Sequence, residues 1–270
     1  MTKLLGVIGD PIAHSLSPLI HNGWFRDLGL DANYEAMQVA DGTFGAALTA
    51  LETRNILGVN VTLPHKQAAL KAARTVSQRA AAIGAANTLT LAENGNWHAD
   101  NTDAPGFKSA IGELDPNTDK AVIFGAGGSA RAVVFALVQV GIDTVILNRT
   151  RAKAKTLADD LGTEQTRVGA IDQHKEYLES ATIVINTTSA GHNGFVFELP
   201  RGEQRRFFDL SYGSVAAPQL RHASEMGWRA QDGLGMLVGQ AAYSFQSWFG
   251  EWPDTKSALR RCEMAVRAAL

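Results

Sequence analysis

Short apolar runs alternate with alanine-rich stretches along most of the chain. Six runs have the length and apolar content of a strand, and they cover residues 4–9, 57–63, 121–125, 144–148, 182–186 and 206–210. Alanine-rich segments with helical spacing lie among them, at residues 67–83, 129–140, 151–161 and 237–249. Short strands that alternate with helices predict an α/β fold with a mainly parallel sheet, rather than a β-sandwich.

A polar, turn-rich segment at residues 112–120 interrupts this pattern. It predicts a domain boundary near residues 103–118, because linkers between compact units favour such residues. The helical pattern that starts near residue 237 carries Trp248 and Trp252, which are suited to packing back onto the first domain. The first domain is then discontinuous in sequence, a point that the pattern alone does not decide.

A glycine turn follows the run that starts at Val122. It has the form G-x-G-x-x-A and is made of Gly125, Ala126, Gly127, Gly128, Ser129 and Ala130. A strand, a glycine turn and a helix in this order are typical of dinucleotide binding, since the backbone can approach a pyrophosphate and the helix N-terminus attracts it. The alternative is a tight structural turn in an unrelated α/β protein.

The residues after the next strand bear on which dinucleotide binds. NAD-binding sites commonly place an acidic residue there to bind the ribose 2′-hydroxyl. This chain has none, and carries Asn148, Arg149, Thr150 and Lys153 instead. A planar guanidinium at Arg149 suits a 2′-phosphate, so the run favours NADP over NAD. The alternative is an ordinary basic start of a helix.

Four polar clusters in the first 103 residues follow short apolar segments. Ser17 and Pro18 predict a helix start, with Ser17 as its N-cap, and Lys66 falls in the first turn of a second predicted helix. The helix dipole opposes a positive charge at that position, so Lys66 is a candidate general base. Residues 84–88 and 101–103 supply further amides and hydroxyls. Taken singly, each cluster is more typical of a cap, a solvated lysine or a turn than of a ligand site.

Composition narrows the choice of function. The chain has 270 residues and a net charge of −2, which argues against a broad nucleic-acid or membrane surface. The single cysteine, Cys262, excludes an internal disulfide and fits a reducing compartment. The N-terminal apolar run is too short for a signal peptide, and the apolar region 121–147 carries too many polar residues to span a membrane. The seven scattered histidines predict no metal site. We therefore expect a cytoplasmic protein that binds small molecules.

Seven motifs in a fixed order resemble the shikimate dehydrogenase family. They are SLSPLIHN (15–22), NVTLPHK (60–66), GAANT (84–88), NTDAPGF (101–107), GAGGSARAV (125–133), NRT (148–150) and DGLGMLVGQAAYSFQSW (232–248). The resemblance implies two α/β domains with a cleft between them. Residues 1–103 with 237–270 are then the substrate-binding catalytic domain, and residues 104–236 the Rossmann-like NADP-binding domain. It further implies reversible reduction of 3-dehydroshikimate to shikimate, a step towards chorismate and the aromatic amino acids.

The resemblance also implies roles for individual residues. Lys66 and Asp103 form the catalytic pair, and the substrate is bound by Ser15, Ser17, Thr62, Asn87, Tyr212 and Gln240. The cofactor is bound by the glycine turn, by the 148–153 run, and by Asn186, Thr187, Thr188, Ser189, Leu210 and Gly233. The partners implied are the small-molecule substrate alone, with neither nucleic acid nor membrane, and the chain acts as a monomer or a homodimer.

Two segments depart from the family pattern. His192 stands where many members have methionine, and the proline that often follows the tyrosine of the 209–220 segment is replaced. The resemblance therefore says less about where the nicotinamide binds than about where the substrate binds. Two alternatives stay open: a quinate/shikimate dehydrogenase that accepts either substrate or NAD, and a non-catalytic regulator that binds NADP or a metabolite.

Overall fold

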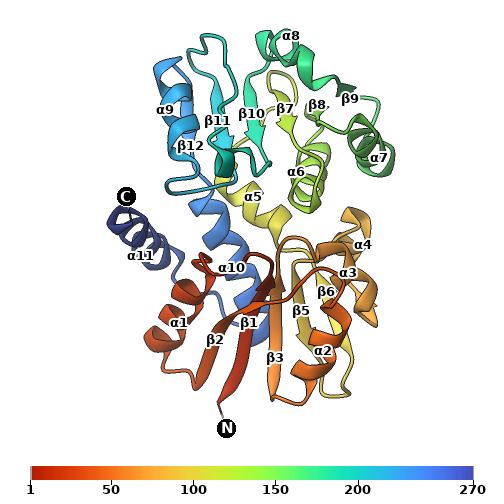
Figure 1. Ribbon diagram of the computed structural model, residues 1–270, viewed down its shortest axis with the longest axis vertical. Helices are drawn as coiled ribbons and strands as arrows, with labels where there is room; N and C mark the ends of the chain where they lie inside the picture. Colours follow the sequence, from red (N-terminus) through yellow and green to blue (C-terminus); the bar gives the residue numbers. More distant parts are fainter. Residues whose placement is uncertain (1, 270) are drawn as a thin grey trace. The chain divides into compact units, whose positions relative to one another are not determined.

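The computed structural model describes residues 2–269 and divides the chain into two compact units. The first comprises Met1–Gly106 and Leu237–Cys262, and the second comprises Phe107–Met236 and Glu263–Leu270. The division points fall inside three helices, α5 (Asp103–Ile111), α10 (Leu234–Phe249) and α11 (Thr255–Ala268). Each unit contains one six-stranded sheet. Figure 1 shows helices beside the sheet of each unit.

The sheet of the first unit is mainly parallel. Its strand order is β2–β1–β3–β5–β6–β4, and the strands are β1 (Lys3–Gly9), β2 (Ala32–Gln38), β3 (Ile56–Val61), β4 (Thr75–Val76), β5 (Thr88–Leu91) and β6 (Trp97–Asp100). Strand β1 pairs in parallel with both β2 and β3, and β4 pairs in parallel with β6. Strand β5 runs antiparallel to both of its neighbours.

Helices cover both faces of this sheet because its central strands are apolar on both sides. One face packs against α2 (Phe44–Glu52), α3 (Lys66–Ala72) and α4 (Gln78–Ile83). Aromatic side chains of α1 (Ser17–Leu28) and α10 pack together in the same unit. His21 lies among them without exposure, stacked on Tyr34 at 4.2 Å between ring centroids. Burial, opposed by the Asn60 side chain, lowers the pKa of His21 to about 3, so its ring is neutral.

Two local predictions for this unit are wrong. The predicted helix 67–83 is broken into α3 and α4: α3 ends at Ala72, the extended Ala73 and the short strand β4 follow, and Ser77 caps α4. Its hydroxyl accepts a hydrogen bond from the backbone N–H of Ala80. Ser17 is not an N-cap either: α1 begins at Ser17 itself, and the cap position is Leu16.

The sheet of the second unit is entirely parallel, in the order β12–β11–β10–β7–β8–β9. Its strands are β7 (Lys120–Phe124), β8 (Asp143–Leu147), β9 (Thr166–Gly169), β10 (Ile183–Asn186), β11 (Arg206–Asp209) and β12 (Arg229–Gln231). Its helices are α6 (Gly128–Val138), α7 (Arg151–Leu161), α8 (His174–Glu179) and α9 (Ala217–Glu225), with short 3-10 turns at Ile171–Gln173 and Ala190–Asn193. This strand order is that of a doubly wound dinucleotide-binding sheet.

Burial on both faces explains why the second sheet is parallel. Along β7, Ala121 and Ile123 belong to a core shared with α6 and α7. Val122 and Phe124 point to the other face and belong to a second core with β8, β10 and β11. The six predicted strands are confirmed as β1, β3, β7, β8, β10 and β11, and the predicted α/β fold class is confirmed with them. Across residues 2–269, none of the helices has the length and hydrophobicity that crossing a membrane requires.

Candidate active site

A buried ion pair joins two of the predicted site residues in the first unit. Lys66 is the first residue of α3, and Asp103 is the first residue of α5. Lys66 Nζ lies 2.5 Å from Asp103 Oδ2, and each side chain is only 8% exposed. Removing two charges from water costs free energy, and an ion pair this deeply buried offsets that cost only with the help of further hydrogen bonds. Such a pair is therefore a candidate for a functional role rather than a purely stabilising one.

The Asn87 amide supplies that support, and its orientation is fixed. The backbone N–H of Thr102 lies 2.7 Å from Asn87 Oδ1, and a backbone N–H can only donate. The Asn87 Nδ2 group therefore faces the other way, where it donates to Asp103 Oδ1 at 2.8 Å and to Gln240 Oε1 at 3.2 Å. Both carboxylate oxygens of Asp103 are thus engaged, one by Lys66 and one by Asn87.

Three further predicted residues lie where strands β1 and β3 end. Ser15 is half-buried in the loop after β1, and its hydroxyl accepts from the backbone N–H of Ser17, a buried residue. Thr62 follows β3, and its backbone N–H donates to the carbonyl of Ile8. These residues and the ion pair follow the carboxyl ends of strands β1, β3 and β6, the side of the sheet where open α/β folds bind ligands.

A close approach of two helices sets the position of Gln240. A Cβ atom added to Gly106 of α5 would lie 2.6 Å from the backbone nitrogen of Gln240 on α10. Real Cβ atoms do not come that close, so a larger residue at position 106 must move one of the two helices. Glycine at this position therefore allows Gln240 to reach the Asn87 amide.

We expect Gly106→Ala to lower the thermal midpoint and to weaken substrate binding. Overpacking of this kind costs about 1–3 kcal/mol, because backbone rather than a flexible side chain must give way. Gly45→Ala is the matched control: Gly45 is also helical, lies in α2, and an added Cβ there meets nothing within 4 Å. Thermal unfolding and the Michaelis constant for substrate measure both effects. Equal midpoints for the two variants would contradict the close approach.

The glycine turn of the second unit joins β7 to α6. Gly125 has φ of +115°, a conformation that favours glycine, and an added Cβ would lie within van der Waals overlap of the Thr187 hydroxyl. An added Cβ at Gly127, by contrast, meets nothing within 4 Å. Gly127 is also the N-cap of α6 and offers no side chain to the helix end. The turn is therefore closed on its sheet side and open above Gly127, as a pyrophosphate needs.

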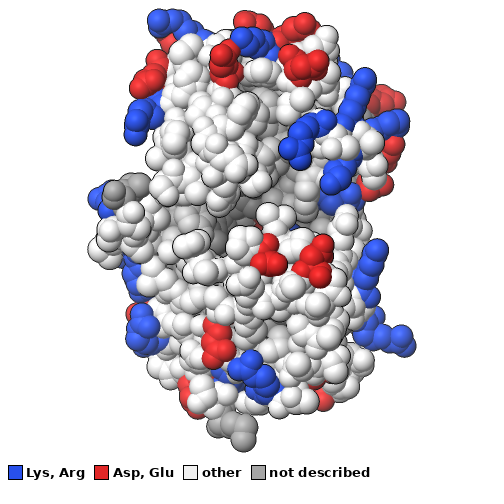
Figure 2. Space-filling view, in the orientation of Figure 1, with Lys and Arg blue, Asp and Glu red and all other residues white. Residues whose placement is uncertain are grey.

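The predicted 2′-phosphate residues follow the adjacent strand β8. The Asn148 side chain donates to the carbonyl of Thr150, which is the N-cap of α7. Arg149, Arg151 and Lys153 are all exposed. Figure 2 shows Lys and Arg side chains gathered over α7. No acidic residue lies between β8 and the first two turns of α7, so the local charge favours an anion.

The remaining predicted cofactor residues lie in loops at the same edge of this sheet. Asn186 links two of these loops: its Nδ2 donates to Asp209 Oδ2, and its Oδ1 accepts from the backbone and hydroxyl of Thr188. Burial raises the pKa of Asp209, although its hydrogen bonds from Asn186 and Ser211 oppose the shift. Gly233 donates its N–H to the carbonyl of Ser211. Thr187, Thr188, Ser189 and Leu210 lie in the loops that these bonds hold, and so does Tyr212, which is predicted to bind the substrate.

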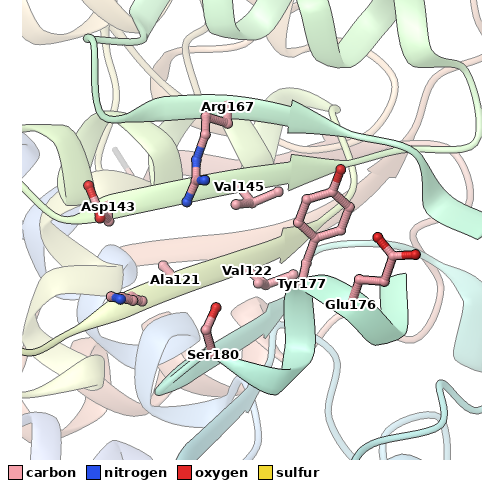
Figure 3. A pocket seen from close by; sticks show the side chains of 9 residues that line it. Ala121, Val122, Asp143, Val145, Arg167, Glu176, Tyr177 and Ser180 are labelled. Carbon is pink, nitrogen blue, oxygen red and sulfur yellow. The ribbon is translucent and has the colours of Figure 1, made fainter. Parts of the chain in front are cut away.

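A pocket of about 210 Å³ opens at the opposite edge of the second sheet. Figure 3 shows side chains of β8, β9 and α8 around it, among them Arg167, Tyr177 and Glu176. Its strand residues, such as Asp143 and Lys120, stand at the amino ends of their strands. Because nucleotides bind at the carboxyl ends of such sheets, this pocket is not a candidate for the cofactor.

The sequence assigns no site role to three buried residues beside the ion pair, although two of them lie in the polar clusters 84–88 and 101–103. Thr88, Thr102 and Ser244 hydrogen-bond to one another and, through Thr88 and Thr102, to Asn87. Ser244 gives a usable signal, since it is a hydroxyl residue one helical turn after Gln240 in an apolar helix. Thr102 shares no apolar pattern with its neighbours, and only the fold brings it to Asn87.

Comparisons with known proteins agree with this arrangement. Residues 7–89 match the family model "Shikimate dehydrogenase substrate binding domain", residues 108–212 match "Shikimate / quinate 5-dehydrogenase", and residues 233–261 match "Shikimate 5'-dehydrogenase C-terminal domain". A curated relative from Hyphomonas neptunium, named "Shikimate dehydrogenase (NADP(+))", is 48% identical over 270 residues and covers 99% of each chain.

Solved structures give the same result. The shikimate dehydrogenase of Aquifex aeolicus has a TM-score of 0.87 and 32% identity, over 97% of each chain. The shikimate 5-dehydrogenase of Thermus thermophilus, solved in complex with NADP(H) and shikimate, has a TM-score of 0.83 and 35% identity over 100% of each chain. The predicted enzyme class and cofactor are confirmed at the level of the family. The chain belongs to the shikimate dehydrogenase family of NADP-dependent oxidoreductases.

Proposed function

We propose that this protein catalyses the reversible, NADP-dependent reduction of 3-dehydroshikimate to shikimate. The observation that carries the proposal is the buried pair of Lys66 and Asp103, with the Asn87 amide donating to the same carboxylate. A non-catalytic member of the family would have no need to keep a charged pair at this depth. Retention of both charges therefore favours the enzyme over a regulator that only binds a metabolite.

The substrate contacts follow from the chemistry of each side chain. We assign Ser15 and Ser17 to the substrate carboxylate, because two hydroxyls at the start of α1 offer donors to an anion. Thr62, Asn87 and Gln240 would contact the ring hydroxyls, together with the catalytic pair. Tyr212, from the loop after β11, would add a further contact to the substrate.

The proton chemistry is assigned to Lys66. Reduction adds a hydride to the ketone carbon, breaks the carbon–oxygen π bond and leaves negative charge on the oxygen. The Lys66 ammonium would donate a proton to that oxygen, and in the oxidation direction the amine would take the hydroxyl proton back. Asp103 would hold Lys66 and the substrate hydroxyl in position, because Asn87 fixes its second oxygen.

The residues of the second unit fit NADP, which supplies or accepts the hydride when bound. The open space above Gly127 suits the pyrophosphate, with the backbone of Gly125–Ala130 around it. Arg149 and Lys153 would bind the 2′-phosphate, flanked by Asn148 and Thr150. Thr187, Thr188, Ser189, Leu210 and Gly233 would line the nicotinamide side.

Wider properties are proposed on the same basis. We assign substrate binding to residues 1–103 with 237–270, and NADP binding to residues 104–236. We further propose that the enzyme acts in the cytoplasm as a monomer or a homodimer and binds no nucleic acid. The net charge of −2 supports the absence of nucleic-acid binding, and the single cysteine supports a reducing compartment.

One assay tests the proposal directly. Purified protein is mixed with shikimate or quinate and with NADP or NAD, in four combinations, and the reduced nicotinamide is followed by its absorbance. Fast reduction with shikimate and NADP is the expected result. Comparable rates with quinate or NAD would instead assign the chain to the dehydrogenases that accept either substrate or NAD. The family model matched by residues 108–212 includes quinate in its name. No rate in any combination, with folded protein, would overturn the enzyme proposal.

A further inference from the structure

A cluster of three buried hydroxyls lies behind the candidate catalytic pair. It consists of Thr88, Thr102 and Ser244, each no more than 1% exposed. Thr88 begins β5, Thr102 directly precedes Asp103, and Ser244 lies on α10 one turn after Gln240. Ser244 Oγ is 2.8 Å from Thr88 Oγ1 and 3.1 Å from Thr102 Oγ1, and Thr88 Oγ1 is 3.0 Å from Thr102 Oγ1, so the three hydroxyls lie within hydrogen-bond distance of one another.

Asn60 connects this hydroxyl cluster to the sheet, and its own orientation is fixed. The Tyr34 hydroxyl donates to Asn60 Oδ1 at 2.7 Å. Burial raises the pKa of Tyr34 well above its usual value, so the phenol keeps the proton that it donates. Asn60 Nδ2 must then point at the cluster, where it donates to Ser244 Oγ at 2.8 Å.

The cluster reaches the catalytic pair through Asn87. The Thr102 hydroxyl lies 3.0 Å from Asn87 Nδ2 and 3.1 Å from its Oδ1, and the Thr88 hydroxyl lies 3.2 Å from the same Oδ1. Asn87 in turn donates to Asp103, which binds Lys66. A continuous set of buried hydrogen bonds therefore runs from Tyr34 to Lys66, and helix α10 contributes Ser244 to it.

We propose that Ser244 is a positioning residue: the Thr102 backbone N–H sets which way the Asn87 amide faces, and Ser244, through the Thr88 and Thr102 hydroxyls, restrains its position, and so holds Asp103 and Lys66 at the reacting oxygen of the substrate. It touches neither substrate nor cofactor in this role. The proposal rests on the proposed function, because positioning matters only where Lys66 and Asp103 carry the reaction. It goes further by making a residue of α10 a determinant of turnover.

Ser244→Ala removes the hydroxyl and little volume. We expect it to lower kcat for shikimate oxidation roughly tenfold, since misplacing reacting groups by a fraction of an ångström has effects of this size. The Michaelis constant for NADP should stay at the wild-type value, because the residues assigned to NADP lie in the second unit. A variant that merely folds less well would give less active enzyme, but each folded molecule would keep the wild-type kcat. A lower kcat per folded molecule is therefore not explained by loss of folding.

Ser247→Ala is the matched control on the same helix. Ser247 is exposed, and its hydroxyl donates to the carbonyl four residues earlier, at 3.0 Å, as the Ser244 hydroxyl does at 3.1 Å. The two substitutions therefore change helix propensity alike and differ in the buried cluster. Equal kcat values for Ser244→Ala, Ser247→Ala and the wild type would overturn the proposal, whereas an inactive wild type would overturn the proposed function instead.

A second pair of variants decides the case if Ser244→Ala does not fold. Thr102→Val keeps the branched shape of the side chain and removes its hydroxyl, and Thr102→Ser keeps the hydroxyl and removes the methyl group. We expect Thr102→Ser to retain most of the wild-type kcat and Thr102→Val to lose about as much as Ser244→Ala. The reverse order would mean that packing, not hydrogen bonding, sets the rate, and would contradict the positioning role.

Discussion

Replacing Lys66 by alanine is expected to lower kcat for shikimate oxidation by about 10²–10⁴-fold, the range that general acid–base groups contribute. The physical reason is that the ammonium bonded to Asp103 is removed from the oxygen that gains or loses a proton. Affinity for shikimate should change little, because Ser15, Ser17 and the ring-hydroxyl contacts remain. Steady-state rates and calorimetric binding of shikimate in the absence of cofactor measure the two quantities separately.

The control for this variant is Lys71→Ala. Lys71 lies on the same helix, α3, and its side chain is exposed. The Lys71→Ala substitution changes the net charge by the same amount as Lys66→Ala and leaves the buried ion pair intact. A Lys66→Ala enzyme with near-normal turnover would remove Lys66 from the chemistry. A loss of shikimate binding as large as the loss of rate would show that Lys66 acts in binding and not in proton transfer.

The sequence predicts the strands that form continuous apolar runs. It misses the edge strands, and it also misses the interior strands β5 and β6, which are only four residues long and contain polar residues. Strands β7, β8 and β10 read as continuous apolar runs because helices cover both sides of them. Strand β2, with the sequence ANYEAMQ, is an edge strand with half of its side chains facing solvent. It therefore has no apolar run to detect, and edge strands β9 and β12 are missed for the same reason.

Capping chemistry accounts for the errors in helix limits. The break between α3 and α4 had a local signal, since the β-branched Thr75 and Val76 precede Ser77, a residue that favours the N-cap position. The alanine-rich segments on either side of this signal favour one continuous helix and hide the break. At α1 the local signal is misleading. Ser17 before Pro18 is typical of an N-cap, but the helix begins at Ser17 itself and Leu16 holds the cap position.

The sequence predicts Lys66, Asn87 and Asp103 as site residues but assigns no role to the three buried hydroxyls, although the polar clusters 84–88 and 101–103 contain two of them. Lys66, Asn87 and Asp103 fall in motifs with several polar residues in a row, and the structure brings these three together through direct hydrogen bonds. Ser244 stands alone among apolar residues of α10, where serine usually serves as a small filler. Its partners are 142–184 residues away in the chain, so only the folded sheet reveals them.

The second large effect is expected at Arg149, where alanine should raise the dissociation constant for NADP roughly ten- to hundredfold. Loss of a charge-assisted hydrogen bond to a phosphate has this size, because such bonds contribute about 1.5–3 kcal/mol. NAD has no 2′-phosphate, so its dissociation constant should stay near the wild-type value. Fluorescence titration of the protein with each dinucleotide gives both constants.

Matched variants separate the phosphate from other roles of this side chain. Lys155→Ala removes another exposed cation, which lies on α7 and is paired with Asp159, and it should weaken the binding of neither dinucleotide. Arg149→Lys keeps the charge and loses the planar fork, so it should retain part of the preference for NADP. A guanidinium that only stacks on adenine would bind NADP and NAD alike. Equal weakening of both by Arg149→Ala would therefore contradict the 2′-phosphate assignment, and with it the reason for expecting NADP at this particular sheet edge.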